Sequence, residues 1–233
     1  MLAYLISSIH ETDRIKNIDL LKKQLNEIIH IEAVYPKNIH VPFLDKILIA
    51  AKNRTNRVLK NSELGLLLSH RAAWESLLKN SADSGLVLES DSMLINKDIL
   101  QEYFTLMHQK YDLFFWGAFD GRIKIYNRDR LFIQENYYIG TPVINSLFCS
   151  YGYSINKKAA NYLLLQTNHV NYPIDFWKYR LKNSNLKIGG VFPEIISTAP
   201  QYKSTIQTNE FNIYNFKFIN FLIDLKNTIL SYL

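Results

Sequence analysis

The sequence has little cysteine, glycine or proline: one Cys, eight Gly and six Pro among 233 residues. The lone thiol, Cys149, excludes an internal disulfide and a cysteine-based zinc site, which favours a reducing compartment and therefore the cytoplasm. So little glycine and proline also excludes a collagenous repeat or a flexible linker array. The chain is expected to fold compactly.

Long uncharged apolar runs are missing as well. The run Leu2–Ile6 is shorter than a signal-peptide core and follows no positive segment, so it is predicted to be a strand. The most apolar stretch, residues 216–233, contains Lys217, Asp224 and Lys226, which disfavours a membrane-spanning helix. Apolar and aromatic residues are nevertheless abundant, at 48% and 13%, and suffice for a sizeable core.

Basic residues outnumber acidic ones by 27 to 21, giving a net charge of +6. This balance suits a protein that meets phosphates or anionic surfaces. One hypothesis is a basic nucleic-acid-binding protein, but the chain has no recognised reader module, so nucleic acid is not the expected partner. Residues 37–60 hold six Lys/Arg against one Asp and are expected to form an exposed connection.

The chain opens with a strand–helix–strand pattern. A buried strand at Leu2–Ser8 precedes a helix, with Asp13 as its cap, whose apolar spacing runs from Ile15 to Ile28, and Ile31–Tyr35 forms the second strand. This pattern predicts an α/β sheet whose ligands lie beyond the carboxyl ends of its strands. Further strands are predicted at 85–88, 111–117, 122–126, 143–155 and 186–192, with helices from Ser62, from Asn156 to Leu165 and near Pro173.

Two carboxylates follow the short apolar strand Gly85–Leu88, in the sequence Glu89-Ser90-Asp91. Side chains alternate along a strand, so Glu89 and Asp91 emerge on the same side and can share one ion. Their hard oxygen atoms suit Mn²⁺ or Mg²⁺. The alternative is an acidic pair that only occupies a turn.

Residues 61–74, which include Ser69-His70, resemble a motif of glycosyltransferase family 25, the family of bacterial lipooligosaccharide galactosyltransferases. In that family a Gly-Glu-x-Gly-Cys-x-Leu-Ser-His segment precedes a Leu-Glu-Asp-Asp strand end, which residues 85–91 resemble in turn. The resemblance covers about residues 1–206 and includes the segments Ser7–Arg14, Gly152–Ile155 and Pro173–Asp175. The chain departs from the pattern at Ser62, Leu66 and Ser90, which stand where the family has Gly, Cys and Asp.

This resemblance implies a GT-A type, Rossmann-like fold with a mixed, mainly parallel sheet over residues 1–206, followed by an amphipathic helical tail at 207–233. It implies inverting, metal-dependent transfer of a hexose, most plausibly galactose, from a UDP-sugar to a lipid-linked saccharide of lipooligosaccharide or lipopolysaccharide. Such an enzyme is expected in the cytoplasm, either free or as a peripheral protein on the inner face of the bacterial inner membrane. Because Ser90 removes one acid, weaker metal affinity is expected, and a catalytically silent family member is the alternative.

An inverting transfer needs a base that takes the proton from the acceptor hydroxyl. The candidate bases are Asp175, which the resemblance supports, and Asp120, which follows a predicted strand. Asp175 also stands near a predicted helix start, so capping is its structural alternative.

The resemblance assigns donor-binding roles to Ser7, Arg14, Glu63 and His70. By its position on a helix face, His70 is equally a core histidine, and the family match favours a role in positioning the donor or a carboxylate, or in catalysis. Glu63 is equally a first-turn acid. Arg14 is equally a pairing group for a diphosphate and a solvated residue at a helix start.

The tail carries an apolar stripe and an opposite polar one at helical spacing. The apolar stripe comprises Tyr214, Phe218, Phe221, Leu225, Ile229 and Tyr232, and the polar one comprises Asn220, Asp224, Asn227 and Ser231. Such a helix packs on its own domain, pairs with another copy in a homodimer, or lies on a membrane surface as a peripheral contact.

Overall fold

The computed structural model describes residues 1–35, 44–118, 121–134, 136–202 and 213–232, and for 213–220 only the backbone. Its elements are β1 (Leu2–Ser7), η1 (Thr12–Arg14), α1 (Ile15–Gln24), β2 (Glu27–Glu32), α2 (Leu44–Thr55), α3 (Asn61–Lys79), β3 (Ser84–Glu89), β4 (Ser92–Leu94), α4 (Lys97–Lys110), β5 (Leu113–Phe115), η4 (Asn127–Asp129), β6 (Leu131–Gln134), β7 (Tyr137–Gly140), η5 (Ile144–Ser146), β8 (Gly152–Asn156), α5 (Lys157–Gln166), α6 (Lys178–Leu181), β9 (Ile188–Phe192), β10 (Ile196–Thr198) and α7 (Ile213–Ser231).

An eight-stranded sheet in the order β2-β1-β3-β8-β5-β9-β7-β6 forms the centre of the molecule, and β10 pairs with β4 in a small second sheet. Among the described residues, the large sheet has three parallel pairs, β1-β2, β1-β3 and β5-β9, and four antiparallel pairs. The sheet is therefore mixed, as predicted. The expectation that it is mainly parallel was wrong, because β8 runs against both of its neighbours and β7 runs against β9.

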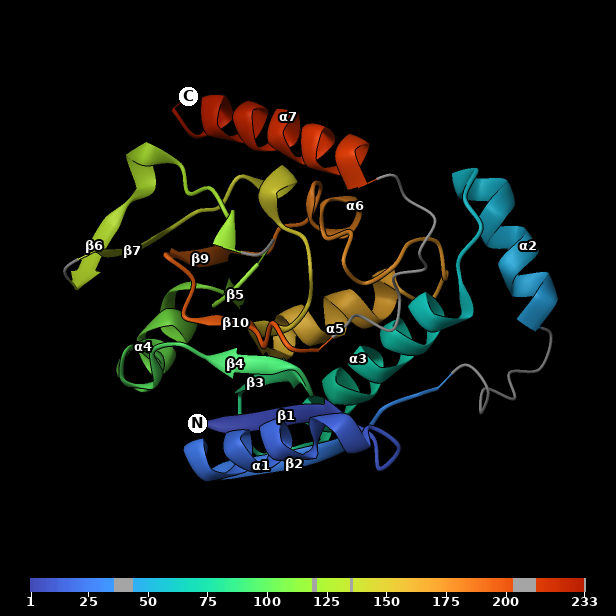
Figure 1. Cartoon of the computed structure of the whole chain (residues 1–233), viewed down its shortest axis with the longest axis horizontal. Coiled ribbons are helices and arrows are strands. Elements are labelled where there is room, and N and C mark those ends of the chain that lie inside the picture. Colours follow the sequence, from blue (N-terminus) through green and yellow to red (C-terminus); the bar gives the residue numbers. More distant parts are fainter. Residues whose placement is uncertain (36–43, 119–120, 135, 203–212, 233) are drawn as a thin grey trace.

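Helices cover both faces of the sheet (Figure 1). Along β1, Tyr4 and Ile6 face α3 and α5, while Ala3 and Leu5 face α1 and α4. All four residues are at most 4% exposed, which explains why β1 is a continuous apolar run rather than an alternating one. The predicted α/β class is confirmed.

Several predicted element boundaries were wrong. The first helix ends at Gln24, so Ile28 lies in β2, which ends at Glu32 rather than Tyr35. Residues 44–55 form helix α2 instead of an irregular connection. The predicted strand at 122–126 is only a single bridge, from Ile125 to Pro142. Within 143–155 only β8 is a strand, and the helix predicted at Pro173 begins at Lys178.

Strand direction decides which residues meet at one edge of the sheet. Because β1 and β3 are parallel, with Ile6 opposite Glu89, their carboxyl ends lie together. The antiparallel β8 begins there, since its first residue, Gly152, pairs with Leu88. The segment that precedes β8 therefore joins the carboxyl ends of β1 and β3. Among the described residues, none of the helices combines the length and apolarity needed to cross a bilayer.

Candidate active site

Three carboxylates lie near one another at the carboxyl edge of β1 and β3. Glu89 is the last residue of β3, Asp91 follows it in the turn to β4, and Asp175 comes from the loop before α6. Ser150, just before β8, contacts two of them: its Oγ lies 2.6 Å from Glu89 Oε1 and 2.8 Å from Asp175 Oδ1. All three acids remain partly exposed to solvent, so a ligand can reach them.

The Ser150 hydroxyl has one proton to donate, although it touches two carboxyl groups. If Asp175 is protonated, Ser150 donates its proton to Glu89 and accepts one from Asp175. If Asp175 is ionised, the two carboxylates compete for the single Ser150 proton. Glu89 and Asp175 are therefore electrostatically linked through Ser150.

A chain of buried groups holds Glu89 from behind. The His70 Nε2 on α3 lies 3.5 Å from Glu89 Oε1, an ion-pair contact when the imidazole is protonated. The His70 Nδ1 lies 2.8 Å from the Tyr153 hydroxyl, which also accepts a hydrogen bond from Trp74 Nε1 at 2.8 Å. Because His70 is fully buried, it can position Glu89 but cannot itself contact a substrate.

A second cluster surrounds Asp91. The Arg14 Nη1 donates to Ser90 Oγ at 2.8 Å and lies 3.3 Å from both Asp91 Oδ2 and Glu11 Oε1. Asn17 holds the same turn by donating to the carbonyl oxygens of Ser90 and Ser92. Arg14 and Ser90, both buried, thus orient Asp91 from the side of η1 and α1.

Burial and neighbouring charges shift the pKa of each of the three acids. Burial opposes ionisation of Glu89, but the His70 and Ser150 contacts and the Arg14 charge outweigh it and lower the pKa of Glu89. Burial, and then the charge of Glu89, raise the pKa of Asp91 to about 6 despite Arg14. Burial and Glu89 also raise the pKa of Asp175 to about 6, against the Ser150 hydrogen bond and the charge of His70. Near neutral pH, Asp175 is therefore an ionised carboxylate that can readily take up a proton.

The loop that carries Asp175 is fixed by a buried cation. The Arg180 guanidinium donates to the carbonyl oxygens of Pro173, at 2.6 Å, and of Tyr172. Burial lowers the pKa of Arg180 to about 10, while the charge of Asp175 acts in the opposite direction. The side chain of Asp175 caps no helix, because α6 begins at Lys178 without a side-chain cap. The contacts therefore favour the site interpretation of Asp175 over capping.

The structure places the predicted residues in three ways. Five of them lie within the two connected clusters at the sheet edge: Arg14, His70, Glu89, Asp91 and Asp175.

Two further predicted residues, Glu63 and Ser7, lie at the margins of these clusters. Glu63 accepts from the Lys60 backbone N–H at 2.9 Å and pairs with Arg57, whose guanidinium stacks on Phe176 beside Asp175. Ser7 ends β1, and its carbonyl accepts from Ala33. Asp120 lies outside the described residues.

Sequence reasoning missed several residues that build the site. Ser150 follows Cys149, whose φ of +65° is unusual for a residue other than glycine. Trp177 Nε1 donates to the Cys149 carbonyl at 2.7 Å and so holds this backbone position. Arg180 lies in a basic stretch of the sequence, yet it is buried. No pattern in the sequence signalled Ser150, and the nearness of Arg180 to Asp175 in the chain was a weak hint.

Glu89 and Asp91 are suited to a divalent cation by their donor chemistry. Asp91 Oδ1 is a buried oxygen without a hydrogen-bond partner among the described residues, and the charge of Glu89 raises the pKa of Asp91. A bound cation would give Asp91 Oδ1 a partner and would offset the negative charge of Glu89. Within the described part of the chain, no group of three His, Cys, Asp or Glu is arranged to hold a metal. The protein would therefore supply two ligands and leave the remaining positions to water and phosphate, as is usual for Mg²⁺.

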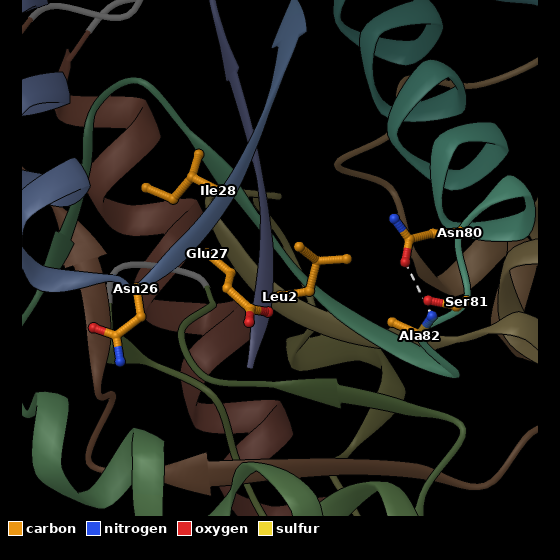
Figure 2. A pocket seen from close by; sticks show the side chains of 7 residues that line it. All are labelled: Leu2, Asn26, Glu27, Ile28, Asn80, Ser81 and Ala82. Carbon is orange, nitrogen blue, oxygen red and sulfur yellow. Dashed lines mark hydrogen bonds between the residues drawn. The ribbon is translucent and has the colours of Figure 1, made fainter.

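The molecule also has a hollow at the opposite edge of the sheet from the three carboxylates. It measures about 590 Å³ and opens between the amino ends of β1 and β2 and the end of α3 (Figure 2). Leu2, at its margin, is five residues along β1 from Ser7, or roughly 17 Å. Among the described residues that line it, Glu27 is the one acid and none is basic. The lining of this hollow therefore offers no pair of carboxylates for a cation.

The buried chain behind Glu89 predicts a stability effect. Tyr153→Phe leaves His70 Nδ1 and Trp74 Nε1 without their shared partner, so the free energy of unfolding should fall by about 1–3 kcal/mol. Tyr4→Phe is the matched control, because the buried Tyr4 hydroxyl has no partner in the described structure and its removal should cost nothing. Chemical denaturation measures both, and equal losses would contradict the role of the Tyr153 hydroxyl.

The fold and the acidic cluster together define an α/β protein with three carboxylates gathered at the carboxyl edge of its sheet. Residues 1–177 match the profile of glycosyltransferase family 25 (LPS biosynthesis protein), and the chain belongs to this family. Membership supports the predicted enzyme class, a glycosyltransferase of lipopolysaccharide biosynthesis.

Other comparisons add little. No curated protein matches the sequence. Crystal structures with a similar course of the chain include A197 from STIV, with 13% identity, coverage of 90% of this chain and 98% of that one, and a TM-score of 0.45. HddC from Yersinia pseudotuberculosis has 14% identity, coverage of 81% and 88% and a TM-score of 0.42. The mannose-1-phosphate geranyltransferase from Thermus thermophilus has 12% identity, coverage of 84% and 75% and a TM-score of 0.43.

Proposed function

We propose that this glycosyltransferase, with a GT-A type arrangement, transfers a hexose with inversion from a UDP-sugar to a lipid-linked saccharide, with Mn²⁺ or Mg²⁺ at Glu89 and Asp91. UDP-galactose is the proposed donor. The observation that carries the proposal is the meeting of Glu89, Asp91 and Asp175 at one edge of the sheet. It provides two cation ligands and a third carboxylate suited to proton transfer.

Each residue has a distinct role in this proposal. Glu89 and Asp91 would hold the cation, whose positive charge would stabilise the negative charge on the departing diphosphate. His70 keeps Glu89 oriented through its buried contact. Arg14, beside Asp91, is placed to contact a diphosphate oxygen when a donor is bound.

Asp175 acts as the base. At neutral pH its carboxylate is ionised, and it takes the proton from the acceptor hydroxyl as that oxygen attacks the anomeric carbon of the donor sugar. The bond from the anomeric carbon to the diphosphate oxygen breaks, and UDP leaves with the electron pair. Ser150 and Arg180 keep Asp175 in place through its side chain and its loop.

A donor screen tests the proposal. Purified protein is incubated with several sugar nucleotides, and the release of free nucleotide is followed with Mn²⁺ and with EDTA. We expect slow release of UDP from UDP-galactose in Mn²⁺, even without an acceptor, and its suppression by EDTA. Full turnover in EDTA would rule out the metal role, and preference for another nucleotide would rule out the UDP donor.

A further inference from the structure

Over residues 221–232, helix α7 turns its most polar side toward the domain, together with the half-buried Ile223 and Leu230, and a stripe of large apolar side chains toward solvent. Asn227 and Ser231 are at most 2% exposed, and Asn227 Nδ2 donates to the Asn145 carbonyl at 3.2 Å. Asp224 lies 3.0 Å from Lys124 Nζ. On the opposite side lies an outer stripe of five residues that are 46% to 71% exposed: Phe221, Leu222, Leu225, Ile229 and Tyr232.

This orientation is the reverse of that of an ordinary surface helix, which buries its apolar face in its own domain. Polar contacts hold α7 in place, so the outer stripe remains available to something outside the chain. Figure 1 shows α7 as the outermost element on its side of the molecule, lying lengthwise across it. A helix in that position can present the outer stripe to a flat surface.

Exposed aromatic and basic groups lie next to the stripe or on the neighbouring hairpin. Lys226 is an exposed residue of α7 itself. On the β6–β7 hairpin, the Phe132 ring is 69% exposed and packs at 5.7 Å against the Tyr138 ring, over which Arg130 stacks. The Arg128 side chain, just before β6, is 67% exposed, and its Nε lies 3.9 Å from the exposed Asp129 carboxylate. Large apolar side chains beside Lys and Arg are typical of helices that lie in a lipid headgroup layer.

We propose that the outer stripe lies on an anionic lipid surface. The net charge of +6 complements such a surface, whereas two copies of this chain would repel each other. The proposal rests on the orientation of α7 and is independent of the sugar-transfer reaction.

Sedimentation with vesicles tests the proposal on the full chain. The vesicles contain phosphatidylcholine with about 30% phosphatidylglycerol, and pure phosphatidylcholine vesicles serve as the neutral comparison. We expect wild type to sediment with the anionic vesicles, and the double variant Leu225→Ser/Ile229→Ser to bind about tenfold or more weakly. Leu165→Ser, which removes another exposed leucine near the end of α5, is the matched control and should bind like wild type.

The charged residues supply a second readout. Arg128→Gln/Lys226→Gln should weaken binding to anionic vesicles and flatten its dependence on salt. Circular dichroism checks that every variant is folded. Wild-type affinity in the Leu225→Ser/Ile229→Ser variant would overturn the proposal. So would a wild-type protein that ignores vesicles but forms a dimer that this variant dissociates, because the stripe would then bind a second copy.

Discussion

Replacing Asp91 with asparagine should lower kcat/KM for UDP-sugar turnover by about a hundred- to a thousandfold. The variant keeps the shape of the side chain but removes the charge that, with Glu89, is proposed to hold the cation at the end of β3. Its buried Oδ1, which has no partner among the described residues, makes Asp91 the site residue most dependent on an external ligand.

Asp98→Asn is the matched control for Asp91→Asn. Asp98 lies further along the chain, exposed in the first turn of α4, and its substitution should leave kcat/KM unchanged. Adding Mn²⁺ should partly restore the activity of Asp91→Asn if the lost group is a metal ligand. Equal losses in the two variants would refute the assignment of Asp91.

Asp175→Asn should lower kcat by about a hundred- to ten-thousandfold and leave the affinity for UDP unchanged, because the base acts on the acceptor and not on the nucleotide. The wild-type pH profile provides the second signature. The pKa of Asp175 is about 6, so below that pH the carboxyl is protonated and cannot accept a proton. At saturating Mn²⁺, which would keep the proposed metal ligand Asp91 ionised, the kcat/KM value should therefore rise with pH through about 6 and level off above it.

The Asp175→Asn variant should lose this rise along with its activity. Asp83→Asn, an exposed position just before the opposite end of β3, is the control and should keep both the activity and the pH profile. A variant that loses only thermal stability, with kcat intact, would show that Asp175 is a structural residue.

The residues at the end of β3 were predictable because they depend on local patterns. An apolar strand that ends in Glu89-Ser90-Asp91 has alternating side chains, and the family motif added His70 and Arg14. Ser150 was not predictable, because it reaches Glu89 only through the antiparallel position of β8 between β3 and β5. Strand order arises from contacts between residues far apart in the chain, and no short segment encodes it.

The orientation of α7 was also beyond the reach of its sequence. Helical spacing identifies two faces but not which of them meets the domain. That choice depends on Lys124 and on the Asn145 carbonyl, which lies 82 positions before its partner Asn227 in the chain. An amphipathic pattern therefore predicts that a helix has a partner, and the tertiary structure decides which face the partner meets.

Calorimetric titration of UDP into the protein, with Mn²⁺ and then with EDTA, tests the central claim most directly. The account predicts that UDP binds at least about tenfold more tightly with Mn²⁺, and that Glu89→Gln/Asp91→Asn abolishes this difference while the protein stays folded. Equal UDP affinity with and without Mn²⁺, or a metal effect that survives in the double variant, would contradict it.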